Sequence, residues 1–216
     1  TSMGSDGFSA YATVRTSATA AWTAPTQMKP AKYVNSFPPH KVAMSGTGEA
    51  FVIWEDLDDA GTQSSVWMRR FSAGAWMTAT LVETYDGGIC DASNVAANTA
   101  GQAIIVWRQL NNSGSEIMAR RYAPATGFAA PVSLGQATGA AWDPAISVAL
   151  DETGAATAAW AFTVQSKYNV YASHAANGQA WPAATAMETD NQSALLSSDP
   201  SLADSSKPAP VVGCDG

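Results

Sequence analysis

One seven-residue pattern, Gly-x-Ala-x-x-x-Trp, occurs three times along the chain at a constant spacing. It covers residues 48–54, 101–107 and 154–160, so its tryptophans are 53 residues apart in both intervals. A period of about 50 residues with several short strands in each unit is typical of β-propeller blades. The pattern therefore predicts an all-β chain built as an array of similar sheets.

Each unit reads as four strands. The pattern itself is the second strand, and its run of consecutive apolar residues indicates that both of its faces are covered. The glycine that opens the pattern predicts a tight turn with positive φ, which glycine adopts without steric strain. The other expected strands are the first at 41–44, 94–97 and 146–150, the third at 65–71, 116–122 and 169–174, and a fourth opening on Trp76, Phe128 or Trp181.

The two ends of the chain each match half a unit. Residues 10–15 and 22–25 match a third and a fourth strand, whereas residues 200–204 and 209–213 match a first and a second strand. Pairing the two halves would complete a further blade and remove two exposed sheet edges. The same pairing could also take place between two chains.

We therefore expect one β-propeller domain over residues 1–216, of about four four-stranded blades, in which the N-terminal strands pair with the C-terminal strands to close the ring. The expected units are residues 41–93, 94–146 and 147–199, with a composite blade made of residues 200–216 and 8–30.

Charge and composition exclude several classes of partner. The net charge is −7, and the 11 Lys and Arg residues are spread along the chain, which argues against nucleic acid and against an anionic membrane surface. No run approaches the ~18 apolar residues of a membrane helix, so membrane insertion is not expected. An acidic chain with few lysines and two distant cysteines favours a secreted, extracellular or periplasmic protein. The polar first residues do not form a signal peptide.

The hairpin pattern, followed by a strand that carries Arg70 or Arg121 and then a glycine–aromatic turn, resembles the repeats of bacterial secreted β-propellers with a sialidase-like fold. The resemblance implies the architecture and an extracellular setting. It does not imply catalysis, because no unit contains the Ser-x-Asp-x-Gly-x-x-Trp box of sialidases. The sequence also offers no assignable set of arginine cluster, nucleophilic tyrosine and acid.

Some residues recur at one repeat position. A basic side chain stands six or seven residues before the fourth-strand aromatic in every unit: Arg15, Arg70, Arg121 and His174. These residues could form a ring that binds anions, but a feature of the repeat unit is more often structural. The repeated Trp54, Trp107 and Trp160 could stack on sugars, yet their apolar strands favour a place in the core.

Aromatic and acidic residues outside the repeat positions point to a ligand site. In a propeller, the loops that join the fourth strand to the next first strand share one face with those that join the second to the third. Aromatic plates beside carboxylates suit a neutral sugar, although the same residues would also suit solvated loops. The candidate ligand-binding residues are Tyr85, Asp86, Asp91, Trp142, Asp143 and Tyr168.

The sequence identifies no catalytic residue, no cofactor and no spacing of metal ligands. Calcium is a weaker alternative, since Asp56, Asp58 and Asp59 crowd within four residues but lack the spacing of an EF-hand loop. Cys90 and Cys214 map to the same face of the array, which suggests a disulfide that fastens the C-terminus.

These observations favour a non-enzymatic protein that binds carbohydrate or another extracellular polymer through one loop face. Two other classes stay open. The chain could be the structural subunit of an extracellular fibre or surface assembly, which would require self-assembly. It could also be a sialidase-like glycoside hydrolase that uses a pair of loop carboxylates.

Overall fold

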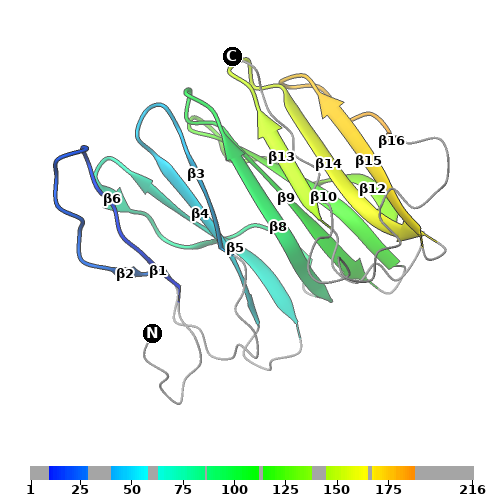
Figure 1. Cartoon of the computed structure of the whole chain (residues 1–216), viewed down its shortest axis with the longest axis horizontal. Coiled ribbons are helices and arrows are strands. Elements are labelled where there is room, and N and C mark those ends of the chain that lie inside the picture. Colours follow the sequence, from blue (N-terminus) through cyan, green and yellow to red (C-terminus); the bar gives the residue numbers. More distant parts are fainter. Residues whose placement is uncertain are drawn as a thin grey trace, which may run out of the picture.

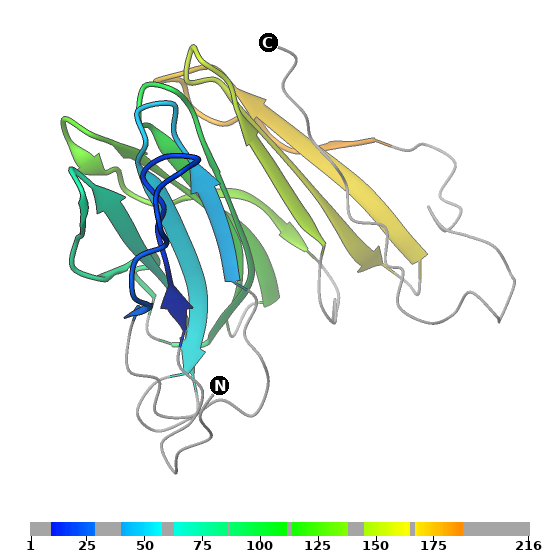
Figure 2. The same ribbon diagram turned by 60° about the vertical axis from the view of Figure 1, so that its left-hand side comes forward.

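The computed structural model describes residues 10–28, 40–57, 63–85, 87–111, 114–137, 145–164 and 167–187. These residues form strands, turns and irregular segments, and none of them is helical. The all-β prediction is therefore confirmed for this part of the chain. The strands make an N-terminal hairpin, a ten-stranded sheet and a four-stranded sheet. The ten-stranded sheet consists of two antiparallel meanders, called sheet 1 and sheet 2, which a single parallel pairing of Ser64 with Ile89 joins; the four-stranded sheet is called sheet 3. The hairpin and the three meanders follow one another across the molecule (Figures 1 and 2).

Sheets 1, 2 and 3 are each an antiparallel meander. Sheet 1 contains β3 (His40–Met44), β4 (Ala50–Leu57) and β5 (Ser64–Ser72), with β6 (Ala75–Trp76) and β7 (Thr80–Leu81) both beside β5. Sheet 2 contains β8 (Ile89–Ala97), β9 (Ala103–Asn111) and β10 (Gly114–Ala123), with β11 (Gly127–Phe128) and β12 (Val132–Ala137) both beside β10. Sheet 3 contains β13 (Ile146–Leu150), β14 (Ala156–Val164), β15 (Lys167–Ala175) and β16 (Thr185–Ala186).

The 53-residue period predicted the first three strands of each unit at positions that the observed strands overlap, although several of these strands extend beyond the predicted bounds. The turn glycines behave as expected, with φ of 81° at Gly48, 75° at Gly101 and 84° at Gly154. The register is also the same in the three sheets, because each repeated tryptophan lies opposite the same position of the third strand. The unit of the sequence is therefore a unit of the structure.

Two details of the prediction are wrong. The first strand of sheet 2 begins at Ile89 rather than at residue 94, so Cys90 and Asp91 lie in β8 and not in a loop before it. Tyr168 likewise lies within β15 rather than in a connecting segment. Both strands extend further because their extra residues find partners on β9 and β14, a tertiary contact that local pattern does not reveal.

The expected fourth strand is present in two short pieces in sheets 1 and 2. In sheet 2 the break contains Pro131, whose missing N–H interrupts the ladder at this outer edge. Sheet 3 keeps only β16, and Trp181 precedes it instead of opening it.

The N-terminal hairpin pairs β1 (Tyr11–Ala12) with β2 (Thr26–Gln27), as expected for a third and a fourth strand. The expected partner strands at residues 200–204 and 209–213 lie outside the described residues. Among the described strands no sheet closes on itself, and the hairpin stays a two-stranded sheet of its own.

The core lies between the sheets and forms two layers. Sheets 1 and 2 enclose one cluster, which includes Phe51, Ile53, Ile105 and Trp107. Sheets 2 and 3 enclose the other, which includes Ile104, Val106, Ile117 and Trp160. Successive residues of β9 therefore enter different layers, which explains the unbroken apolar run in its sequence. The repeated tryptophans are all buried, as predicted.

The repeated arginines have structural roles. Arg70 bonds Glu49 on the turn of its own sheet, with Nη1 2.8 Å from Oε1, and its guanidinium lies over the ring of Tyr122 in sheet 2. Arg121 reaches sheet 3, where it donates to the carbonyl of Gly154 at 2.6 Å. The structural interpretation of this position is therefore confirmed for both arginines.

Arg15 does not share that position. The amide of Thr23 bonds the carbonyl of Val14 just as the amide of Met77 bonds the carbonyl of Arg70, so Val14 is the equivalent residue. The assignment of Arg15 was therefore out of register by one residue. Its guanidinium instead lies 5.2 Å from the ring centroid of Trp22.

Packing between sheets should dominate stability. Replacing the fully buried Ile105 by Ala removes methyl groups from the layer between sheets 1 and 2 and should lower the free energy of unfolding by about 2–5 kcal/mol. Ile89→Ala is the matched control, because its side chain is 43% exposed, and it should cost less than about 1 kcal/mol. Urea unfolding measures the loss of unfolding free energy in the two variants. Equal losses would contradict a core that lies between the sheets.

Candidate functional site

The six residues expected on the loop face are only partly described. Tyr85 and Asp91 belong to the described segments, and Tyr168 is placed in β15 by its backbone alone. Asp86, Trp142 and Asp143 lie outside the described residues. Tyr85 and Asp91 lie near the same end of sheet 2, but the prediction of the whole set stays a prediction.

The carboxylate of Asp91 is engaged by an arginine. Arg108, directly opposite on β9, donates through Nε to Oδ1 of Asp91 at 2.6 Å and through Nη2 to Oδ2. Arg108 is buried, so this two-pronged ion pair lies largely out of water. The arrangement favours a structural role for Asp91 in joining β8 to β9.

Tyr85 packs on two glycines. A Cβ atom at Gly87 would lie 2.6 Å from the ring atom Cζ of Tyr85, and one at Gly88 would lie 2.0 Å from the carbonyl oxygen of Leu110. Only glycines allow so close an approach of the turn to the ring and to β9. The half-buried tyrosine thus covers the turn that leads into β8.

Glu55 near the end of β4 crosses to sheet 2. Its Oε1 accepts hydrogen bonds from the backbone amide of Ser93 at 2.8 Å and from the hydroxyl of Ser93 at 2.9 Å. Burial raises the pKa of Glu55 to about 7, and the negative charge of Asp91 adds to the rise. The hydrogen bonds from Ser93 lower the pKa but do not offset the effect of burial. Near neutral pH this carboxyl group therefore exchanges its proton inside the interface between two sheets.

Cys90 is a free cysteine in the structure, and its side chain is fully buried between sheets 1 and 2. Burial raises the pKa of its thiol to about 12, so it remains protonated at neutral pH. Cys214 lies outside the described residues, and the disulfide between them stays a prediction.

The described residues bring together no group of three or more His, Cys, Asp or Glu side chains that could hold a metal ion. Asp56 is buried at the end of β4. Asp58 and Asp59 lie outside the described segments, so the calcium alternative is not tested by the structure.

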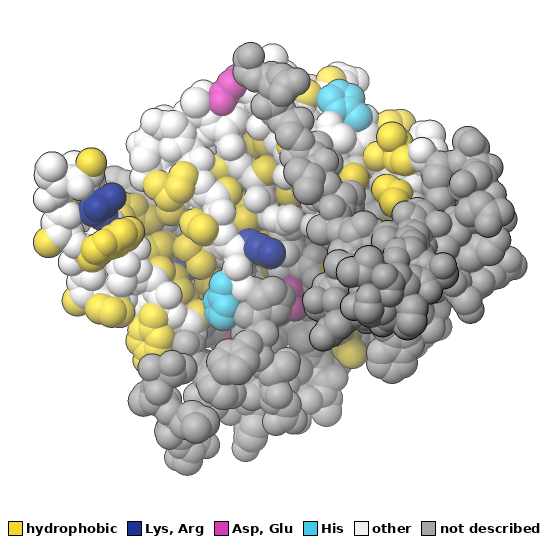
Figure 3. Space-filling model, viewed as in Figure 1, with side chains coloured by type: hydrophobic (Ala, Val, Ile, Leu, Met, Phe, Trp, Pro, Cys, Tyr) yellow, Lys and Arg dark blue, Asp and Glu magenta, His cyan; other side chains and the backbone are white. Residues whose placement is uncertain are grey.

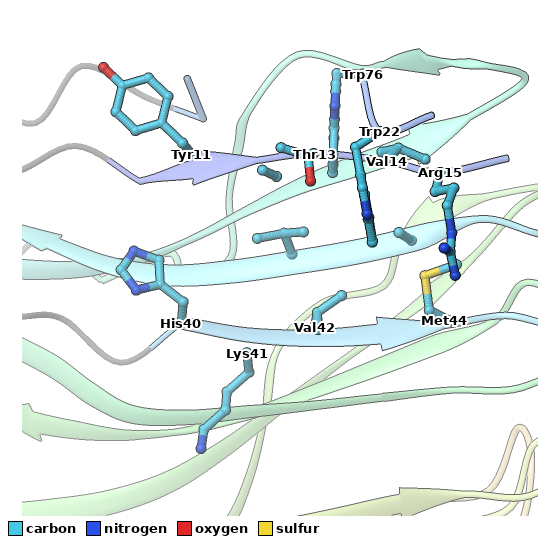
Figure 4. A pocket seen from close by; sticks show the side chains of 13 residues that line it. Tyr11, Thr13, Val14, Arg15, Trp22, His40, Lys41, Val42, Met44 and Trp76 are labelled. Carbon is cyan, nitrogen blue, oxygen red and sulfur yellow. The ribbon is translucent and has the colours of Figure 1, made fainter. Parts of the chain in front are cut away.

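Two open clefts between neighbouring sheets hold the exposed aromatic side chains. The first, called cleft A, lies between the hairpin and sheet 1 and has a volume of about 370 Å³. Tyr11 and Trp22 enter it from the hairpin, Trp76 from sheet 1, and Arg15 and His40 stand at its two ends (Figure 4). Trp22 is 62% exposed and Tyr11 59% exposed, which is unusual for such large side chains.

Cleft B lies between sheets 2 and 3 and has a volume of about 250 Å³. Trp181 forms one wall, and the guanidinium of Arg121 lies 5.6 Å from its ring centroid. Ser133 and Gln179 add a hydroxyl and an amide, while small alanines from both sheets leave the space open.

The two clefts are equivalent in the repeat. Trp76 and Trp181 both occupy the aromatic position ahead of the fourth strand, and each faces the third strand of the preceding sheet. Ala12 in cleft A and Ala119 in cleft B are likewise small residues of that third strand. Sequence reasoning noted these tryptophans only as strand markers, since nothing local shows that the next sheet leaves them uncovered.

No protein-family model matches the chain, and no curated protein matches it. Among solved structures it is similar to an endo-arabinase from Bacteroides thetaiotaomicron VPI-5482, with TM-score 0.46 and 14% identity over 79% of this chain and 70% of that chain.

It is also similar to a fucose lectin from Kordia zhangzhouensis, solved with methyl-fucoside, with TM-score 0.41 and 15% identity over 67% of this chain and 96% of that one. A third similar structure is a glycosyl hydrolase from Bacteroides ovatus, with TM-score 0.40 and 12% identity over 71% and 49% of the two chains. At these identities and TM-scores, function has to be argued from this chain's own residues.

The described part of the chain contains no helix of the length and hydrophobicity needed to span a membrane.

The raised pKa of Glu55 predicts a pH-dependent stability. Between pH 4.5 and about 7 the folded protein keeps a proton that the unfolded chain has lost, so the free energy of unfolding should fall as the pH rises through this window. The fall amounts to at most about 3 kcal/mol, at about 1.4 kcal/mol per pKa unit. Glu55→Gln keeps the acceptor for Ser93 but cannot ionise, and it should flatten the profile. Urea titrations from pH 4 to 8 test this, and parallel profiles for the two proteins would refute it.

Proposed function

We propose that this chain is a secreted, non-enzymatic β-propeller protein that binds carbohydrate at the outer clefts between its blades. The observation that carries the proposal is the repetition of cleft A in cleft B, each with a tryptophan at the same repeat position on its wall. Trp54, Trp107 and Trp160 are fully enclosed in the layers, whereas Trp76 and Trp181 are half-buried at their margins, where Trp181 also packs against the core between sheets 2 and 3.

The chemistry of the clefts suits a sugar ring. An indole offers an apolar face to the C–H side of a pyranose, and the hydroxyls need donors and acceptors at the margin. Cleft A supplies Arg15 and His40, and cleft B supplies Arg121, Ser133 and Gln179. Pockets for drug-sized ligands measure about 300–1,000 Å³, so a cleft of 250 Å³ suits one ring better than a long chain.

The architecture belongs to the same proposal. The three meanders and the hairpin are successive blades of a propeller of about four blades, in which residues 200–204 and 209–213, from the same chain or from a second copy, complete the blade that the hairpin begins. The acidic composition and the scarcity of lysine support an extracellular or periplasmic location.

The loop face around Tyr85 and Asp91 is a second candidate surface. Its acceptors are less available, because Arg108 already binds both carboxylate oxygens of Asp91. We therefore place the ligand at the clefts ahead of the loop face.

A glycosidase activity is favoured by one observation, the pKa of about 7 at Glu55, which is the value expected of a general acid. Asp91 would be its partner carboxylate. Glu55 is half-buried with its Oε1 bonded to Ser93, and Asp91 is held by Arg108, so both carboxylates are already engaged within the protein. Release of reducing sugar from glycans by the intact chain, lost in Glu55→Gln, would establish this second function.

The test of glycan binding is a glycan array at neutral pH followed by calorimetry with the best ligand. Binding should have a stoichiometry near two, one site in each cleft. Trp76→Ala and Trp181→Ala should each remove one site, because loss of the stacked ring weakens binding by roughly tenfold or more.

Met187→Ala is the control, since this side chain is 63% exposed and lines neither cleft, and it should bind as the parent does. A glycan array without hits would contradict the proposal, as would unchanged glycan binding by both tryptophan variants.

A further inference from the structure

The N-terminal hairpin reproduces the outer half of a blade in detail. The amide of Met28 bonds the carbonyl of Ala10, and the amide of Val82 bonds the carbonyl of Val66 in the same way. Met28 and Val82 are both buried. The strand β1 therefore corresponds to β5, and β2 corresponds to β7.

An arginine repeats the same contact between consecutive units. Arg120 of sheet 2 donates to the carbonyl of Val82 in sheet 1 at 2.7 Å. Arg69 of sheet 1 donates to the carbonyl of Gln27 in the hairpin, also at 2.7 Å. The hairpin is thus seated on sheet 1 as sheet 1 is seated on sheet 2.

Among the described residues, no strand occupies the position of the inner half of this blade. The first strands of the three sheets carry a valine at one equivalent position: Val42, Val95 and Val148. Each valine pairs with the residue that lies two positions before the repeated tryptophan in the second strand. Val95 is 7% exposed and Val148 8% exposed, because the preceding sheet covers each of them. Val42 is 63% exposed, and Met44 beside it is 59% exposed. Hydrophobic side chains accordingly gather on this end of the molecule (Figure 3).

The edge of β1 is equally open. The odd-numbered residues of β5 make the backbone hydrogen bonds to β4. Their counterparts in the hairpin are Tyr11, Thr13 and Arg15. Within the described residues no strand pairs with this edge of β1. The inner floor of cleft A, made of Val42, Met44, Ala50 and Val52, lies beside that edge (Figure 4). The space has the width of two strands, namely the first and second strands of the absent half-blade.

Residues 200–213 have the sequence that fits this space. At a period of 53 residues, Gly213 is equivalent to Trp160. Val212 is therefore equivalent to Ala159 and to Val106. Val106 faces the next sheet in the array. Val212 and Leu202 would therefore face Val42 and Met44. Pro210 is equivalent to Phe51, whose N–H points to the first strand of its sheet. Proline lacks this N–H, so Pro210 would lose a hydrogen bond to the first strand but none to β1.

The arrangement of the sheets indicates which copy supplies these strands. The last described strand, β16, belongs to sheet 3, whereas the open groove belongs to the hairpin. Figure 1 places the hairpin and β15–β16 at opposite ends of the array, with sheets 1 and 2 between them. A contact between the tail of one copy and the head of the next joins these two ends without bending the array.

We propose that the groove between the edge of β1 and the face of β3 receives residues 200–213 of a second copy of this chain. Residues 209–213 then form a strand antiparallel to β1, with Val211 opposite Thr13 and Val212 opposite Ala12. The contact is head-to-tail, so repetition of it builds a closed ring or a filament of chains. The inference does not affect glycan binding in cleft B, which keeps its opening with all its own strands in place. A docked strand would cover the floor of cleft A, so an assembled chain should bind glycan with a stoichiometry nearer one than two.

The register can be tested by a mixed disulfide. Ala12 and Val212 form a non-hydrogen-bonded pair, whose Cα atoms lie about 4.5 Å apart, within the range that a disulfide spans. Two full-length proteins are prepared in a Cys214→Ser background, one with Ala12→Cys and one with Val212→Cys. Each variant alone should stay uncrosslinked at this pair, and an oxidised mixture should yield a disulfide-linked heterodimer. Val211→Cys in place of Val212→Cys is the matched control, since its side chain points to the other face, and the heterodimer should be lost.

A chain that carries both Ala12→Cys and Val212→Cys separates the two sources of the strand. An internal disulfide in a monomer would show that the ring closes within one chain and would overturn the proposal. Absence of any crosslink would overturn the docking itself. Val42→Asp provides a second measurement: the position is open to solvent in the single chain, so the fold should persist, while sedimentation velocity should show assemblies reverting to monomers. Unchanged assemblies in this variant would also overturn the proposal.

Discussion

Burial of one apolar strand between two sheets is the interaction on which this structure depends. A strand such as β9 sends Ile105 into the layer with sheet 1 and Ile104 into the layer with sheet 3. Neither face can be left in water without losing the main driving force for folding, about 25 cal/mol for each Å² of apolar surface. Every sheet therefore needs a neighbour on both sides, and the array has no natural end.

The ends of the array follow from that constraint. Sheet 1 has the hairpin for a neighbour, but the hairpin is only half as wide as a blade and covers only the outer strands. The inner strand β3 keeps Val42 and Met44 exposed as a result. Apolar surface of this kind marks an interaction site in a soluble protein. The clefts lined by Trp76 and Trp181 are smaller regions of incomplete coverage. They arise because sheets that share a core diverge at their outer edges.

The interactions between neighbouring sheets are polar as well as apolar. Arg69 and Arg120 each tie a third strand to the carbonyl groups of the preceding unit, and Arg121 ties sheet 2 to the turn of sheet 3. Glu55 adds a contact to Ser93 that depends on its protonation. A repeated unit thus carries its own means of attachment, which explains why basic residues recur at fixed positions without forming a binding ring.

The sequence by itself determined the period, the order of the strands, the turn glycines and the burial of the repeated tryptophans, because these depend on local backbone geometry and on a pattern copied along the chain. Only the tertiary structure decided that β8 starts at Ile89, that Arg108 engages Asp91, and that Trp76 and Trp181 line open clefts. Each of these depends on how far one sheet covers the next. That coverage is a property of two units in space, and no single stretch of residues records it.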